Sequence, residues 1–272
     1  MTGFALNHMT VARLDYRALL DLAGGLGLTG VEVRNDLPQA LFDGMPPEAA
    51  GDAARARGLR LLAVAEVKRF NDWSAAKAAE ALALIGIARA AGAEAVSLIP
   101  RNDNQGMGNG ERQAALRVAL KALKPMLEDH GLTGMVEPLG FETCALRHKS
   151  EAVEAIEAIG GTGCFKLVHD TFHHRLAQDG PLYPAHTGIV HISGVTDQSV
   201  TPGQMTDAHR VLVERTDRLG NIEQLAALAA AGWQGPVSFE AFAPQVHASR
   251  DPAGDLARSI GHIREGLARL AA

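Results

Sequence analysis

The chain has 272 residues, of which 47% are hydrophobic and 21% are charged, and its net charge is −5 with the histidines neutral. These values are typical of a soluble globular protein. No Pro/Gly/Ser-rich or single-charge stretch marks a linker, so we predict a single domain over residues 1–272. The acidic balance, with no basic cluster beyond Lys68 and Arg69, argues against a nucleic-acid partner.

The amino-terminal residues Met1–Asn7 contain no basic region and no long apolar stretch. We therefore expect neither a signal peptide nor a membrane span, and we expect a cytoplasmic location with no membrane partner. The two cysteines, Cys144 and Cys164, are not in a Cys-x-x-Cys spacing, so buried thiols are expected rather than a disulfide or a thiolate zinc site. The sequence is also compatible with a homo-oligomer.

Eight apolar, β-rich segments alternate with helical patterns along the chain. We place the strands near residues 4–8, 30–34, 60–66, 95–99, 134–138, 165–170, 188–193 and 236–241. Ser74 is the expected N-cap of an alanine-rich helix, and the residues Glu111–His130 and Asp251–Leu270 are typical of two more helices. Several helical patterns end in a glycine, which suits the left-handed turn after a helix; these glycines are Gly27, Gly58, Gly92, Gly131 and Gly232.

A repeated tetrapeptide supports a repeating strand and helix unit. The sequence Gly-Leu-Thr-Gly begins at Gly27 and again at Gly131, a distance of about three units of roughly 35 residues. Alternating strands and helices indicate a parallel sheet with right-handed crossovers. Because eight units favour closure, and no Gly-x-Gly-x-x-Gly turn follows the first strand, the predicted fold class is α/β, a (β/α)8 TIM barrel.

Ionisable side chains stand at the expected carboxyl ends of strands five to eight. They are Glu137, Asp170, His191 and Glu240. Burying a lone charge costs several kcal/mol, and a shared cation removes that cost. In this kind of barrel the functional groups lie at the carboxyl ends of the strands, which are about 4.8 Å apart. Three carboxylates and one imidazole therefore predict a site for one divalent ion such as Mn²⁺, Mg²⁺, Co²⁺ or Zn²⁺.

The same segments resemble a known family. Val136–Gly140, Asp170–His173, His191 and Ser238–Glu240 are similar to motifs of the xylose isomerase-like barrel superfamily, which includes sugar isomerases, epimerases and endonuclease-type phosphodiesterases. Within it the likeness is greatest to inosose (2-keto-myo-inositol) isomerases, and it extends over nearly the whole chain.

The resemblance implies that Glu137, Asp170, His191 and Glu240 bind the metal, while His173 and Arg210 face the substrate. Related isomerases often carry a Pro-Gly-x-Gly turn soon after this arginine. Here the different segment Val211–Gly220 follows, which bears on the identity of the substrate.

The predicted chemistry is proton transfer on an α-hydroxy ketone. A metal that binds the carbonyl and hydroxyl oxygens acidifies the C–H bond between them and stabilises an enediolate. Glu137 and Glu240 are expected on opposite sides of the ion as catalytic base and acid, with His173 as a proton relay or electrophile. Arg210 would hold a polar substituent or an oxyanion, and Glu142 is a further candidate to reach the pocket from the loop after strand five. We therefore predict an isomerase or epimerase of a keto-sugar or inosose-type ketocyclitol.

Three other functions are considered. A hydroxypyruvate isomerase would use the same chemistry on a smaller substrate. An endonuclease-IV-like phosphodiesterase would need two or three metals, a basic groove and more strand-end histidines, of which the first strand offers only His8. A catalytically silent binding barrel would be expected to lack one of the four ligands.

Several neighbouring residues have simpler interpretations. Glu32 and Arg34 share a strand face and could simply pair with each other in the barrel mouth. His169 precedes a predicted ligand, so strand alternation should point it away from the site. Phe70 and Trp73 follow strand three and could either form an aromatic wall of the pocket or lie buried under a helix.

Overall fold

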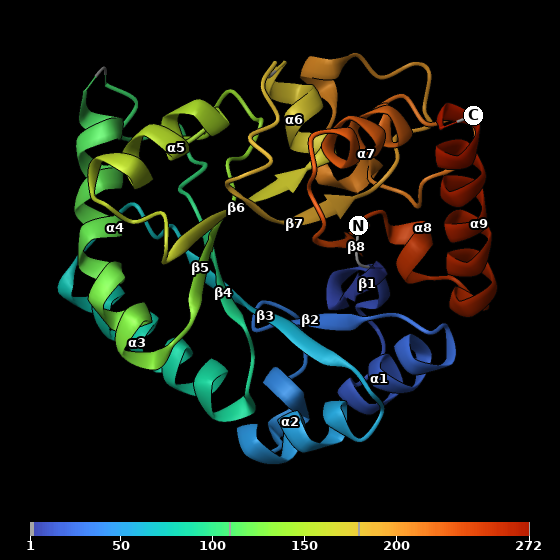
Figure 1. Ribbon diagram of the computed structural model, residues 1–272, viewed down its shortest axis with the longest axis horizontal. Coiled ribbons are helices and arrows are strands. Elements are labelled where there is room, and N and C mark those ends of the chain that lie inside the picture. Colours follow the sequence, from blue (N-terminus) through green and yellow to red (C-terminus); the bar gives the residue numbers. More distant parts are fainter. Residues whose placement is uncertain (1–2, 109, 179, 272) are drawn as a thin grey trace.

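Eight parallel strands form a closed barrel in the order in which they occur along the chain, with β8 paired to β1 (Figure 1). The computed structural model describes residues 3–108, 110–178 and 180–271. The strands are β1 Gly3–Asn7, β2 Gly30–Arg34, β3 Arg60–Lys68, β4 Ala95–Ile99, β5 Thr133–Val136, β6 Phe165–Asp170, β7 Thr187–Ile192 and β8 Pro236–Phe239. The predicted (β/α)8 TIM barrel is therefore confirmed.

Helices surround the barrel as an outer ring (Figure 1). The α-helices are α1 Tyr16–Gly25, α2 Pro47–Arg55, α3 Ala75–Ala91, α4 Glu111–His130, α5 Lys149–Ala158, α6 Thr171–Ala177, α7 Asn221–Ala230, α8 Pro244–His247 and α9 Pro252–Leu270. Short 3₁₀ helices lie in the loops: η1 His8–Val11, η2 Leu41–Gly44, η3 Pro202–Gln204 and η4 Asp207–His209.

The predicted helix boundaries agree with local hydrogen bonding. The Ser74 side chain accepts a bond of 3.1 Å from the Lys77 amide at the start of α3, and Asp251 accepts one of 2.9 Å from the Gly254 amide at the start of α9. Gly92 follows α3 with φ of 70°, and the other four predicted closing glycines also have positive φ. Only glycine adopts this conformation without steric cost, so these turns are set by sequence.

An apolar layer closes the barrel interior beneath the strand ends. Ala5, Leu62, Val168 and Ile189 are buried together there, with Met135 packed against them. Side chains two residues apart on a strand share a face, so Asn7, Glu137, Asp170 and His191 lie directly above four of these residues. The larger part of the core includes both strand and helix side chains, such as Val31 and Leu20. The polar groups thus rest on a packed apolar floor.

The strand ends differ slightly from the prediction. β5 ends at Val136 and β8 at Phe239, so Glu137 and Glu240 are the first residues after their strands, whereas β3 continues to Lys68. None of the helices in the described residues is both long enough and apolar enough to cross a membrane.

Candidate metal and substrate site

The four predicted strand-end side chains converge. Glu137, Asp170, His191 and Glu240 each offer a ligand atom, and these atoms all lie within 4.8 Å of one another. All four residues are buried, with at most 4% of each exposed. A cluster of three carboxylates and one imidazole, withdrawn from water, is a donor set that suits a hard or borderline divalent cation.

His191 is oriented by a carboxylate that the sequence prediction did not assign to the site. Its Nε2 lies 3.0 Å from Glu32 Oε2, and the other oxygen of Glu32 accepts a bond of 2.5 Å from Ser238 Oγ. This arrangement turns His191 Nδ1 towards Glu240 Oε2 at 3.1 Å and Glu137 Oε1 at 3.6 Å, yet Nδ1 makes no hydrogen bond of good geometry within the described part of the chain. A buried nitrogen that lacks a bond and faces carboxylates fits a metal ligand, held by an outer carboxylate.

Charge explains the protonation of His191. Burial lowers its pKa, but the negative charges of Glu32 and Glu240 outweigh that effect and raise the pKa well above its ordinary value. The imidazole is therefore protonated when no cation is present, and a bound cation would displace that proton.

Asp170 is fixed by the end of a strand and the start of a helix. It is the last residue of β6 and the N-cap of α6, where Oδ1 accepts bonds from the amides of Phe172 at 2.7 Å and His173 at 3.2 Å. Its other oxygen, Oδ2, accepts a bond of 2.5 Å from Arg210 Nη2. The carboxylate therefore has a single position in the cluster.

Glu240 is surrounded by donors from across the barrel. Oε1 accepts from Asn7 Nδ2 at 3.2 Å and from Arg34 Nη1 at 2.8 Å, and Oε2 accepts from Arg210 Nη2 at 3.0 Å. Burial alone would raise the pKa of Glu240, but His191, Arg210 and Arg34 together lower it well below its usual range. Glu240 is thus held ionised.

Glu137 is the exception in the cluster. Its carboxylate has no hydrogen bond of normal length to any side chain in the described residues; the nearest donor is His191 Nδ1 at 3.6 Å. Burial and the charge of Glu240 raise the pKa of Glu137 to about 7, although His191 partly opposes them. Of the two glutamates, only Glu137 combines free hydrogen-bonding capacity with a pKa near neutrality.

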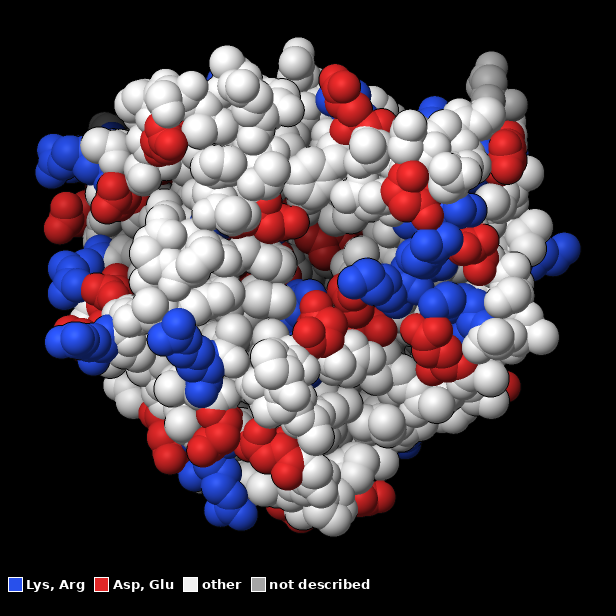
Figure 2. Space-filling model, turned by 180° about the vertical axis from the view of Figure 1, so that it is seen from behind, with Lys and Arg blue, Asp and Glu red and all other residues white. Residues whose placement is uncertain are grey.

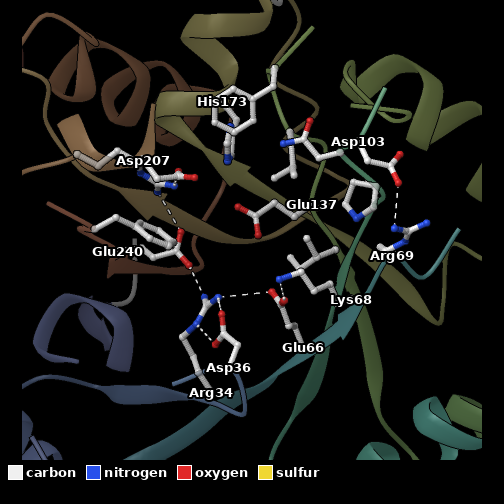
Figure 3. A pocket seen from close by; sticks show the side chains of 17 residues that line it. Arg34, Asp36, Glu66, Lys68, Arg69, Asp103, Glu137, His173, Asp207 and Glu240 are labelled. Carbon is white, nitrogen blue, oxygen red and sulfur yellow. Dashed lines mark hydrogen bonds and ion pairs between the residues drawn. The ribbon is translucent and has the colours of Figure 1, made fainter. Parts of the chain in front are cut away.

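A cavity of about 370 Å³ lies against this cluster. Its volume is within the range of roughly 300–1,000 Å³ that is typical of small-molecule sites. The face of the molecule drawn in Figure 2 is hollowed near its centre, where Asp and Glu side chains gather, with Lys and Arg side chains along one side. In Figure 3, Glu137 points into the middle of the cavity, between Glu240 and the Glu66 side chain.

His173 and Arg210, which the resemblance implies face the substrate, both line this cavity. His173 is buried on α6, and its Nδ1 has no hydrogen-bond partner among the described residues. Burial lowers its pKa, so the ring is neutral. Arg210 follows η4 and is only 1% exposed; its guanidinium lies over the rings of Phe172 and Phe242, at 5.0 and 4.5 Å from their centroids. Arg210 also binds two members of the cluster, a contact the sequence did not indicate.

Other predicted side chains lie elsewhere. The Glu142 side chain is 85% exposed, 4.0 Å from Arg147, and does not line the cavity, so the structure does not bring it to the site. Phe70 is fully buried in the core with Trp73 packed against that core, so neither forms a wall of the cavity. The phenylalanine side chains that line the cavity are instead Phe141 and Phe242.

The pairing of Glu32 with Arg34 does not form. Both side chains are buried on β2, but Glu32 binds His191 and Ser238, while Arg34 binds Asp36, Glu240 and Glu66; the distances are 2.8 Å to both Asp36 oxygens, 2.8 Å to Glu240 and 3.4 Å to Glu66. The partners of Glu32 lie across the barrel interior on β7 and β8, whereas Arg34 also binds Asp36 just after β2 and Glu66 on the neighbouring β3. Alternation along β2 could have indicated that both residues face the interior.

The histidine next to Asp170 has the structural role expected of it. His169 faces away from the cluster, with Nδ1 3.0 Å from Lys149 Nζ and Nε2 2.9 Å from Gln224 Oε1. His174 is half-buried and its Nδ1 lies 2.6 Å from the same lysine nitrogen. Cys144 and Cys164 are free, buried thiols, as predicted.

The fold and the site together define a (β/α)8 barrel with an acidic and imidazole cluster at the carboxyl ends of strands five to eight. The chain belongs to the xylose isomerase-like TIM barrel family, whose sequence model matches residues 20–266. A comparison with curated protein sequences finds no significant match.

Several solved structures are similar to this barrel over nearly the whole chain. A xylose isomerase domain containing protein from Salmonella typhimurium LT2 is 27% identical, with a TM-score of 0.90 and 97% coverage of both chains. The IolI protein, whose structure holds a zinc atom, is 17% identical with a TM-score of 0.84 and 98% coverage of both chains. D-psicose 3-epimerase from Clostridium cellulolyticum H10, solved with D-tagatose, is 13% identical with a TM-score of 0.73 and coverage of 97% and 99%. For the last two proteins, which are 17% and 13% identical, the likeness shows a shared fold alone.

Proposed function

We propose that this protein is a divalent-metal-dependent isomerase or epimerase that moves a proton on a small α-hydroxy ketone, of the keto-sugar or inosose type. The observation that carries the proposal is the convergence of Glu137, Asp170, His191 and Glu240 within 4.8 Å, beside a cavity that Glu137 and Glu240 line. Family membership and the two more distant barrels, one with zinc and one with a ketohexose, support it.

The four side chains fit one divalent ion because they supply three carboxylates and a buried imidazole nitrogen that has no hydrogen bond. When bound, the ion would polarise the substrate oxygens and acidify the C–H bond between them. Asp170 and Glu240 would act as fixed, ionised ligands, because amide and guanidinium donors already hold their oxygens in place. Glu32 would keep His191 in the tautomer that leaves Nδ1 free.

The two glutamates differ in what they can do. Glu137 faces the cavity without a close donor and has a pKa near neutrality, so it is the better placed of the two to take and return a proton. Glu240 is bound by Asn7, Arg34 and Arg210, which stabilise its charged form and make it a weaker base. A two-base mechanism requires Glu240 to exchange one of these bonds for the substrate.

The remaining cavity residues suit binding of oxygen atoms. His173 is neutral, so it can donate a hydrogen bond from one ring nitrogen and accept at the other. Arg210 presents a charge fixed by Asp170 and Asp207, which can stabilise a developing oxyanion. In the lining of the cavity, His173 packs against Phe141 and Arg210 lies over Phe242.

The proposal is tested by assaying protein loaded with Mn²⁺, Co²⁺, Zn²⁺ or Mg²⁺ against inososes, ketohexoses and hydroxypyruvate, with product detection by NMR. We expect turnover of at least one neutral ketose or inosose that is lost on chelation and restored by the metal. Glu137→Gln should bind substrate and have at least 100-fold lower kcat. Activity that persists after verified metal removal would contradict the proposal.

A further inference from the structure

The side of the cavity formed by β2, β3 and β4 carries six charged residues, of which only Arg34 has a part in the proposed chemistry, through its bond to Glu240. They are Arg34, Asp36, Glu66, Lys68, Arg69 and Asp103. Four of them are saturated by short contacts with other charged groups. Arg34 binds both oxygens of Asp36 at 2.8 Å, and Arg69 and Asp103 are joined at 2.9 Å. Charged side chains paired in this way have little capacity left for a ligand.

Glu66 and Lys68 are different because their contacts are long. Glu66 Oε2 lies 3.4 Å from Arg34 Nη2, and Glu66 Oε1 lies 3.7 Å from Lys68 Nζ. A charged N–H···O hydrogen bond is usually about 2.7–2.9 Å, so both contacts are longer than usual and leave the carboxylate able to accept further bonds. Figure 3 shows the Glu66 carboxylate between Arg34 and Lys68, facing the same cavity as Glu137.

The two side chains also differ in accessibility. Glu66 is only 6% exposed, whereas the Lys68 side chain is 68% exposed at the rim. They stand two residues apart on β3, so they share a strand face and present an acceptor inside the cavity and a donor at its rim. Glu66 is not part of the four-residue cluster, so its carboxylate would not be occupied by the metal and can bind the substrate.

We propose that Glu66 and Lys68 are specificity-determining residues that bind adjacent hydroxyl groups at the end of the substrate remote from the metal. A hydroxyl can donate to the carboxylate while its neighbour accepts from the ammonium, so the pair matches a vicinal diol. This inference rests on the proposed function, because it takes the substrate's reacting end to lie at the cluster.

The same pair disfavours a phosphate at the remote end. A dianion there would meet the buried carboxylate of Glu66, and Asp36 and Asp103 also line this wall. Among the described residues that line this side, Arg34 and Arg69 are already paired at short distances, and part of the charge of Lys68 is balanced by Glu66. The wall therefore selects neutral polyhydroxylated substrates over phosphorylated ones.

The test measures binding by isothermal titration to protein loaded with Mn²⁺, using D-allulose, its 6-deoxy analogue and its 6-phosphate as probes. We expect wild-type protein to bind D-allulose more tightly than either analogue. Glu66→Gln should weaken D-allulose binding about tenfold, while its binding of the 6-deoxy analogue changes little, because the lost hydroxyl is the partner of Glu66. Lys68→Met should weaken D-allulose binding several-fold.

A matched control is Asp72→Asn, which makes the same chemical change in the loop after β3 but outside the cavity. Its affinity should equal that of wild type. Each variant is also titrated with Mn²⁺ and melted, and unchanged values show that the fold and the metal site are intact. The proposal is overturned if the wild type binds the 6-phosphate at least as well as D-allulose. It is equally overturned if Glu66→Gln weakens both neutral probes alike or neither of them.

The outcome separates this inference from the proposed function. Binding that depends on Glu66, with no turnover of any ketose or inosose, would leave the specificity pair standing and reject the isomerase. Turnover with an unchanged KM in Glu66→Gln would support the isomerase and reject the specificity pair.

Discussion

Replacing Arg210 with Met should destabilise the metal-free protein strongly. Arg210 is 1% exposed and contacts Asp170 at 2.5 Å and Glu240 at 3.0 Å, so its removal leaves Asp170 without its guanidinium partner and takes one of two arginine partners from Glu240. Removing one partner of a buried ion pair costs about 3–5 kcal/mol. At about 2 °C per kcal/mol for a chain of this size, the melting temperature should fall by about 6–10 °C.

Added metal should reduce that loss. A divalent ion bound to Asp170 and Glu240 supplies the positive charge that Arg210 no longer provides, so the difference between wild type and Arg210→Met should shrink with Mn²⁺. Differential scanning fluorimetry with chelator and with Mn²⁺ measures both differences. The control is Arg60→Met, whose partner Glu94 is about half exposed; losing this surface pair should cost about 0–1 kcal/mol. A difference below about 1 kcal/mol for Arg210→Met with chelator would refute the reasoning.

Three further predictions concern the cluster. Glu32→Gln should lower metal affinity about 10–100-fold in a chelator competition titration, because Glu32 orients His191; unchanged affinity would contradict that role. Asp170→Asn should lose both metal binding and turnover, whereas His173→Ala should keep the metal and lose most activity, and loss of metal in the His173 variant would place that ring among the ligands. In metal-free protein the pKa of Glu137 is raised to about 7 from 4.5, so folding favours its protonated form. That stabilisation is complete below about pH 4.5 and is lost as the pH rises through 7. Wild type should therefore lose stability relative to Glu137→Gln over that range in urea titrations, and a constant difference would contradict the raised pKa.

The sequence predicted the barrel and the four converging side chains because both depend on local pattern. Apolar strands, helix-closing glycines such as Gly92 and the caps at Ser74 and Asp251 are read within a few residues of chain. The carboxyl ends of strands in a parallel barrel meet at one mouth, so ionisable groups at those ends had to be neighbours.

The contacts that the sequence did not indicate run across the barrel. Asn7 and Arg34 bind Glu240, and Glu32 binds His191, between residues more than 150 positions apart in the chain. Strand alternation shows which side chains face inward, but it does not select among several inward charges. Their pairing depends on strand tilt and register. The exposed position of Glu142 likewise depends on the loop after β5, for which no periodic pattern exists.

The most direct test of the account is turnover in deuterated water by the metal-loaded protein with a substrate found in the panel assay. If Glu137 removes and returns a proton in a cavity open to solvent, deuterium should appear on the product carbon next to the carbonyl, as seen by NMR and mass spectrometry. It should appear early in the reaction, and Glu137→Gln should neither turn over nor exchange. Product that carries no deuterium at any time point would contradict proton transfer by Glu137 and would indicate that the substrate hydrogen moves directly between carbons.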